Sequence, residues 1–92
     1  MTTETEIGRY PIDHCAAMVL GWAGLPGGYE PGGFVSKVLD AFACADSDGF
    51  DRLRSAFPNL GAAMQLYKHH DHGVVILRET VENQADTFPE GV

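Results

Sequence analysis

The stretch His69-His70-Asp71-His72 carries side chains that can bind a metal ion. If a helix through Tyr67 continued, His69 and His72 would share a face, and Asp71 would add a ligand for zinc or a similar ion. A structural zinc site needs four ligands, and no CxxC pair supplies the others. The sequence therefore favours a polar helix end, where the dipole stabilises imidazolium, with a small metal-binding protein as an alternative.

An acidic cluster at Asp46, Ser47, Asp48 and Asp51 offers oxygen ligands without the spacing of a calcium loop. An EF-hand loop ends on a glutamate at its twelfth position, and the twelfth residue from Asp46 is Phe57. We expect these side chains to cap the start of a helix.

Two glycine pairs, Gly27-Gly28 and Gly32-Gly33, suggest a phosphate-binding loop. Neither follows an expected strand and no Lys-Ser or Lys-Thr comes after them, so P-loop and Rossmann patterns both fail. Turn chemistry explains them, with a type II turn at Pro31-Gly32. Serines and histidines show no nucleophile-base spacing either, so we assign no catalytic residue, metal or cofactor and expect a protein that is not an enzyme.

The helices that would position these residues follow from apolar spacing. We expect helices over 12–22, 34–45, 50–57, 60–67 and 74–81, with N-caps at Asp13, Asn59 and Asp71. These segments predict an all-α, compact bundle of four to five short helices; the alternative is an α+β fold with a short C-terminal strand over 74–77. One core should unite the large apolar residues Phe34, Leu39, Phe42, Leu53, Phe57 and Met64.

Composition and charge indicate one acidic domain. The chain has 92 residues, a hydrophobic content of 45% and a net charge of −7. Residues 1–8 and 82–92 carry −5 of this, so we divide the chain into an acidic N-terminal tail over 1–8, a helical domain over 9–82 and a C-terminal tail over 83–92. The absence of a basic face argues against direct nucleic-acid binding. An acidic nucleic-acid mimic that inhibits a DNA-binding enzyme remains an alternative.

Several features favour a cytoplasmic protein, in the host cell if the chain is phage-encoded. No apolar run approaches the roughly 18 residues of a membrane span. The first residues are acidic, where a secretory signal would be basic. Cys15 and Cys44 lie on or beside apolar stripes and are expected to be free thiols.

Three aromatic residues, Trp22, Tyr29 and Phe34, bracket the glycine-rich connection between the first two expected helices. Such residues either anchor a loop to the core or form a protein contact. We predict that they form an interaction surface for another protein, with a homodimer as one form of that contact.

The segments Gly32-Gly-Phe34, Leu39-Asp-Ala-Phe42, Ala45-Asp46, Leu53, Ala56-Phe-Pro58 and Tyr67-Lys68 form a pattern of GGF, AD, L and AFP. The pattern resembles small uncharacterised proteins of actinobacterial phages and their hosts, over about 40 of the 92 residues. The resemblance implies a phage or mobile-element origin, and it transfers no catalytic residue. The expected function is that of a non-enzymatic, phage-related accessory protein that binds a host or phage protein.

Overall fold

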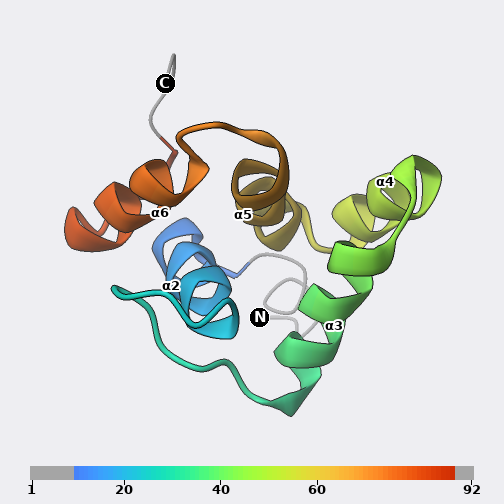
Figure 1. Ribbon diagram of the computed structural model, residues 1–92, viewed down its shortest axis with the longest axis horizontal. Coiled ribbons are helices and arrows are strands. Elements are labelled where there is room, and N and C mark those ends of the chain that lie inside the picture. The colour runs from blue at the N-terminus through green and yellow to red at the C-terminus, as the bar shows by residue number, and fades with distance from the viewer. Residues whose placement is uncertain (1–9, 89–92) are drawn as a thin grey trace, which may run out of the picture.

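Five α-helices make up the part of the chain that the computed structural model describes, residues 10–88 (Figure 1). They are α2 (Ile12–Trp22), α3 (Gly33–Cys44), α4 (Ser47–Ala56), α5 (Pro58–His69) and α6 (Gly73–Glu82). No β-strand occurs in this range, so the all-α prediction is confirmed and the α+β alternative is wrong. The reason lies in the period of α6, which buries Ile76, Leu77 and Thr80 and leaves Val75 exposed. None of the helices in the described range has both the length and the hydropathy of a membrane span.

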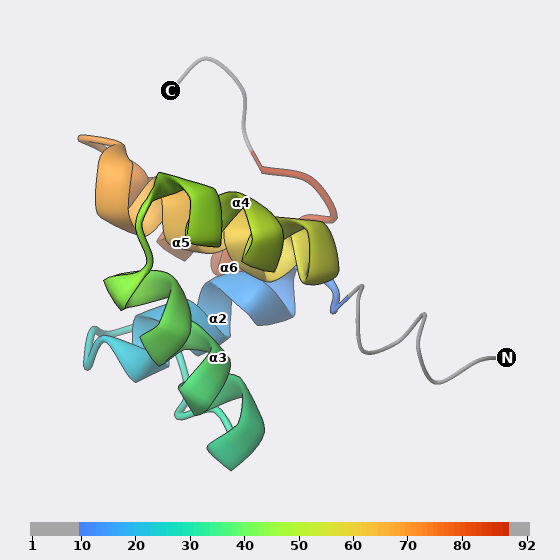
Figure 2. The ribbon, with the colours of Figure 1, turned by 90° about the vertical axis from the view of Figure 1, so that its right-hand side faces the viewer.

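α2 is buried because nearly all of its side chains are apolar, and residues 15–20 are buried without exception. α5 and α6 pack against it and against each other. α3 and α4 contact α5 as well, so α5 touches every other helix of the described range. Figures 1 and 2 show that α4 lies beside α5 and that α3 is inclined away from α5. The core therefore lies around α2 and α5.

The expected core is largely present. Leu39, Phe42 and Met64 are fully buried, and the edge of the Phe42 ring meets Phe50 with their centroids 5.1 Å apart. Leu53 and Phe57 are half-buried and pack against this cluster. Burial of these side chains supplies the main favourable term for folding.

Phe34 is the exception: its side chain is 58% exposed, so its assignment to the core is wrong. It is the second residue of α3, and a Cβ added at Gly32 or Gly33 would meet no atom within 4 Å. The first turn of α3 thus extends past the helices that cover the rest of its apolar face. Phe34 is on the face that the periodicity predicts, and among the described residues its ring contact is with Phe57.

Helix capping follows the expectation at one position. Asp46 caps α4, and its Oδ1 accepts a hydrogen bond of 2.8 Å from the backbone N–H of Gly49. The acidic cluster therefore serves as a helix start, as its residue types predict. The caps predicted at Asp13 and Asp71 are wrong: Asp13 lies in the first turn of α2, and Asp71 precedes His72, the N-cap of α6.

The cap predicted at Asn59 is also wrong, because Pro58 occupies the first position of α5. Proline has no N–H to leave unpaired and a fixed helical φ, so it is favoured at the first position of a helix. The Asn59 side chain is free for another role. Its Nδ2 donates a hydrogen bond of 2.5 Å to the carbonyl oxygen of Tyr10, which ties the start of the described chain to α5.

The two cysteines are free, as predicted. Cys15 is fully buried in α2, and Cys44 is exposed at the end of α3. Burial raises the pKa of the Cys15 thiol to about 12, and the negative charge of Asp13 adds to this shift. Cys15 is therefore a protonated core side chain at neutral pH.

The end of the described chain returns to the bundle. Phe88 is half-buried and packs against the core cluster, although it lies in the segment over 83–92 that the sequence suggests is a tail. The domain boundaries at residues 9 and 82 stay predictions. Residues 1–8 of the expected N-terminal tail lie outside the described residues.

Candidate functional site

The connection over residues 23–32 returns along α2 and is held there by close backbone contacts. A Cβ at Gly28 would lie 2.2 Å from the carbonyl oxygen of Ala17, and one at Gly21 would lie 1.8 Å from the carbonyl oxygen of Tyr29. Only glycine permits both approaches. The backbone N–H of Tyr29 donates a hydrogen bond of 3.2 Å to the same Ala17 oxygen. The backbone of Tyr29 is therefore docked on a helix and is not part of a free loop.

The turns of this connection differ in part from the prediction. Gly24 (φ 77°) ends α2 in a Schellman motif, in which the N–H of Leu25 donates a hydrogen bond of 2.8 Å to the carbonyl oxygen of Leu20. A second positive φ, 98°, occurs at Gly27 after Pro26. The type II turn predicted at Pro31-Gly32 is wrong, since Gly32 has φ −67° and is the N-cap of α3.

The Tyr29 side chain is 49% exposed on this fixed backbone. Its partial burial raises the pKa of the phenol above its ordinary value, and electrostatic interactions with the Cys15 thiol group and the Asp13 carboxylate add to this shift. The hydroxyl is therefore protonated at neutral pH and can donate a hydrogen bond. Tyr29 combines a large apolar ring, a polar tip and a defined position, the combination found at binding anchors.

Trp22 is half-buried at the end of α2, next to Gly21 and hence beside the docked backbone of Tyr29. Its Nε1 donates a hydrogen bond of 2.8 Å to Oδ1 of Asp40 in α3. Its ring meets Tyr67 of α5 edge-on, with centroids 5.9 Å apart. These contacts give Trp22 a structural role between three helices and leave part of its ring at the surface.

Phe34 lies apart from the other two predicted interaction residues. Its ring is tilted against Phe57, centroids 6.0 Å apart, at the start of α5, whereas Trp22 contacts Tyr67 near the end of α5. Ten residues of helix separate these two contacts by about 15 Å. The structure thus places the backbone of Tyr29 beside Gly21, the chain neighbour of Trp22, and places Phe34 elsewhere; whether any of the three binds a partner remains a prediction.

The histidine stretch does not form the helical face on which the metal alternative depends. α5 ends at His69, with His70 as its C-cap, and α6 begins at Gly73. A Cβ at Gly73 would lie 1.8 Å from the carbonyl oxygen of Leu66, so the chain turns sharply here. Nδ1 of His70 accepts a hydrogen bond of 3.0 Å from the N–H of His72. Residues 10–88 contain no group of three or more metal-ligating side chains close enough to hold an ion.

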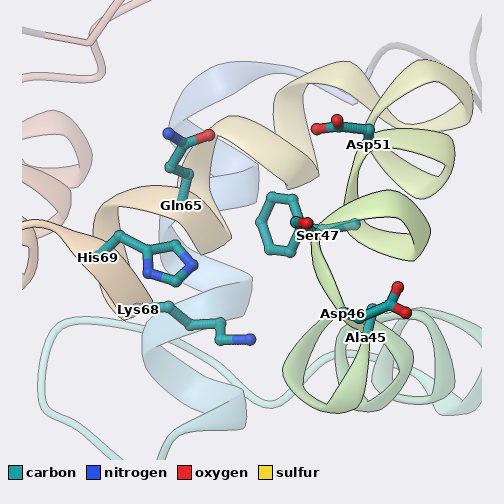
Figure 3. Close-up of a pocket in the computed structure, with 8 residues that line it drawn as sticks. Ala45, Asp46, Ser47, Asp51, Gln65, Lys68 and His69 are labelled. Atoms are coloured by element: carbon teal, nitrogen blue, oxygen red, sulfur yellow. The ribbon is translucent and has the colours of Figure 1, made fainter.

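A cavity of about 260 Å³ lies between α4, the α3–α4 junction and α5 (Figure 3). Gln65, Lys68 and His69 of α5 line one side, opposite Ser47 and Asp51 of α4. Polar groups and a half-open shape make it a candidate ligand site.

The ammonium group of Lys68 in this cavity already has partners within the fold. The Lys68 ammonium donates to the carbonyl oxygens of Phe42 (3.2 Å) and Ala43 (3.0 Å), and it lies 5.6 Å from the Phe50 ring centroid. The lysine closes the C-terminus of α3, where unpaired carbonyls favour a cation. Sequence reasoning missed this role, because the bonds join residues 25 and 26 positions apart.

Three side chains with a hydroxyl or thiol are likewise bonded to the backbone. Ser36 donates to the carbonyl oxygen of Pro31, Thr80 to that of Ile76 and Cys44 to that of Ala41. These bonds satisfy local carbonyls and activate no hydroxyl or thiol.

The chain matches no protein-family model, and no curated protein or solved structure is significantly similar to it. The resemblance to phage and actinobacterial proteins therefore stays a prediction. The functional argument depends on the geometry of the described residues alone.

Proposed function

We propose that this protein is a non-enzymatic accessory protein that binds another protein through Tyr29, with the exposed part of Trp22 as a second contact. These two residues are called the aromatic surface below. The observation that carries the proposal is the docking of the Tyr29 backbone on α2 while about half of its side chain remains exposed. A fixed aromatic anchor loses little conformational entropy on binding.

The rigidity of the surface distinguishes it from ordinary exposed apolar residues. Gly21 and Gly28 permit the close approach on one side, and the hydrogen bond from Trp22 to Asp40 fixes the indole on the other. Val75 is exposed to a similar degree, 52%, but stands alone on α6. An isolated exposed aliphatic residue is normal for a protein surface and makes a useful control.

The biological setting of the proposal comes from the sequence. The resemblance to phage and actinobacterial proteins supports a host or phage protein as the partner, and action in the cytoplasm of the host is part of the proposal. A second copy of the chain is the alternative occupant, since a two-fold contact would bury Tyr29 of both copies.

Affinity capture from host lysate tests the proposal, with wild type compared with Tyr29→Ala and Val75→Ala. We expect wild type and Val75→Ala to retain one common protein and Tyr29→Ala to lose it. Circular dichroism checks that the variants are folded. Equal capture by both variants would contradict the proposal.

Light scattering on the same proteins decides between the two occupants. A dimer that becomes a monomer only in Tyr29→Ala would place a second copy on the aromatic surface. Phe34→Ala, tested alongside, shows whether the contact extends to the first turn of α3.

A further inference from the structure

A second cavity, of about 300 Å³, lies on another side of α5 from the aromatic surface and has an apolar wall. Ala62 and Leu66 of α5 and Phe88 from the end of the described chain contribute its apolar side chains. Its size is at the lower end of the range for small-molecule sites. A ligand of the size of one aromatic ring with a short chain would suit this volume.

The polar side of the cavity carries the guanidinium of Arg54, in contrast to the acidic balance of the rest of the protein. Among the described residues its lining includes Arg54, His69 and His70 and no carboxylate. Residues 10–88 as a whole carry ten Asp and Glu against five Lys and Arg. A basic pocket in an acidic protein indicates a local preference for an anion.

Arg54 is held in place by two contacts with α5. Its Nη1 donates a hydrogen bond of 2.5 Å to Oε1 of Gln65, and its stem lies over Gly61, where an added Cβ would be 2.7 Å from the Arg54 Cγ. Within the described residues the ion pair of this helix belongs to Arg52, which binds Asp48 at 3.0 Å, and Arg54 has no carboxylate partner. A positioned guanidinium without a counter-ion is a natural carboxylate receptor.

We propose that this cavity binds a small organic anion, with its apolar body against Leu66 and Phe88 and its carboxylate on Arg54. The proposal is independent of the aromatic surface. A free aryl carboxylic acid and the C-terminal carboxylate of a peptide ending in an aromatic residue share this chemistry, so the experiment includes both.

An NMR titration of the full chain tests the proposal with hydrocinnamate, its neutral amide hydrocinnamide and the peptide acetyl-Gly-Gly-Phe with a free carboxylate. We expect saturable shifts of the Leu66 and Gln65 signals, with dissociation constants of about 1–10 mM for so small a ligand. Whichever carboxylate binds more tightly, hydrocinnamate or the peptide, indicates whether the ligand is a free acid or a peptide C-terminus. Hydrocinnamide should bind at least about fivefold more weakly than hydrocinnamate.

Arg54→Met retains the apolar stem and removes the charge, and it should weaken hydrocinnamate binding about fivefold to tenfold. Arg52→Met makes the same change in net charge on the same helix and should leave binding within about twofold. Equal weakening by the two variants would overturn the proposal, because the effect would then be one of overall charge. The proposal would also be overturned if hydrocinnamide bound as tightly as hydrocinnamate. It would be overturned as well if neither carboxylate gave saturable shifts at Leu66 and Gln65.

Discussion

The backbone N–H of Tyr29 donates a hydrogen bond of 3.2 Å to the carbonyl oxygen of Ala17, in the middle of α2. The bond is long, and the stronger restraint is the contact of Gly28 and Gly21 with the opposing backbone. Together they hold the connection between α2 and α3 against the bundle. The position of the Tyr29 ring therefore depends on two glycines that have no functional group of their own.

Gly28→Ala should displace this connection, because its Cβ would lie 2.2 Å from a backbone oxygen. We expect a loss of about 1–3 kcal/mol in the free energy of unfolding, measured by urea denaturation. Gly33→Ala is the matched control: its Cβ meets nothing within 4 Å and lies in a helix, so stability should stay or rise by up to about 1 kcal/mol. Equal effects of the two substitutions would show that the connection is not packed as described.

Phe42→Ala should cost about 3–5 kcal/mol, because Phe42 is fully buried and packs on Phe50. Phe34→Ala makes the same chemical change at a residue that is 58% exposed and should cost less than about 1 kcal/mol. Thermal denaturation of the two variants compares them directly. If Phe34→Ala were the more damaging, the first turn of α3 would have to be covered in solution.

Lys68→Met keeps the side-chain stem over Phe50 and removes the ammonium that binds the carbonyls of Phe42 and Ala43. We expect a loss of about 1 kcal/mol in the free energy of unfolding. Lys37→Met, at an exposed position of α3, should change it by less than about 0.5 kcal/mol. Urea denaturation at high salt as well as low salt adds a check, since a hydrogen-bonded cap should survive salt better than a purely electrostatic effect.

The Cys15 thiol should make stability fall at alkaline pH. Burial raises its pKa from 9.0 to about 12, so the unfolded chain loses this proton first and the free energy of unfolding declines between these two pH values. From about pH 8 to about pH 10.5, wild type should lose about 2 kcal/mol more than Cys15→Ala. Identical losses in the two proteins would mean that the thiol ionises as easily in the folded state as in the unfolded one.

The helices could be predicted from the sequence because their apolar residues recur at helical intervals. The segment over 74–77 was ambiguous by composition, and the burial of Ile76, Leu77 and Thr80 on one face resolves it as part of α6. The Asp46 cap was predictable for a local reason, since its acceptor and the Gly49 N–H are three residues apart.

Contacts between distant residues could not be predicted in the same way. The exposure of Phe34 depends on where α3 ends relative to its neighbours, and the bonds of Lys68 depend on how α3 meets α5. Periodicity gives the face of a helix but not the length of the helix that covers it. The exposure of Phe34 and the role of Lys68 therefore both depend on tertiary packing.

Part of the candidate site could be predicted from the sequence. The aromatic residues around the connection were apparent, but the docking of Tyr29 was not, because it needs glycines on two segments to meet. Gly21 inside an otherwise apolar helix was the available signal, since an interior helical glycine often marks a close backbone approach. The basic pocket at Arg54 gave no local signal, since Gln65 lies eleven residues away.

The most direct test of the account is the dissociation constant for the captured partner protein, measured by calorimetry with wild type, Tyr29→Ala and Val75→Ala. The account predicts an increase of about 30-fold for Tyr29→Ala, as for an aromatic binding anchor, and a change within about twofold for Val75→Ala. A dissociation constant that stays the same in folded Tyr29→Ala would contradict the assignment of the aromatic surface as the binding site.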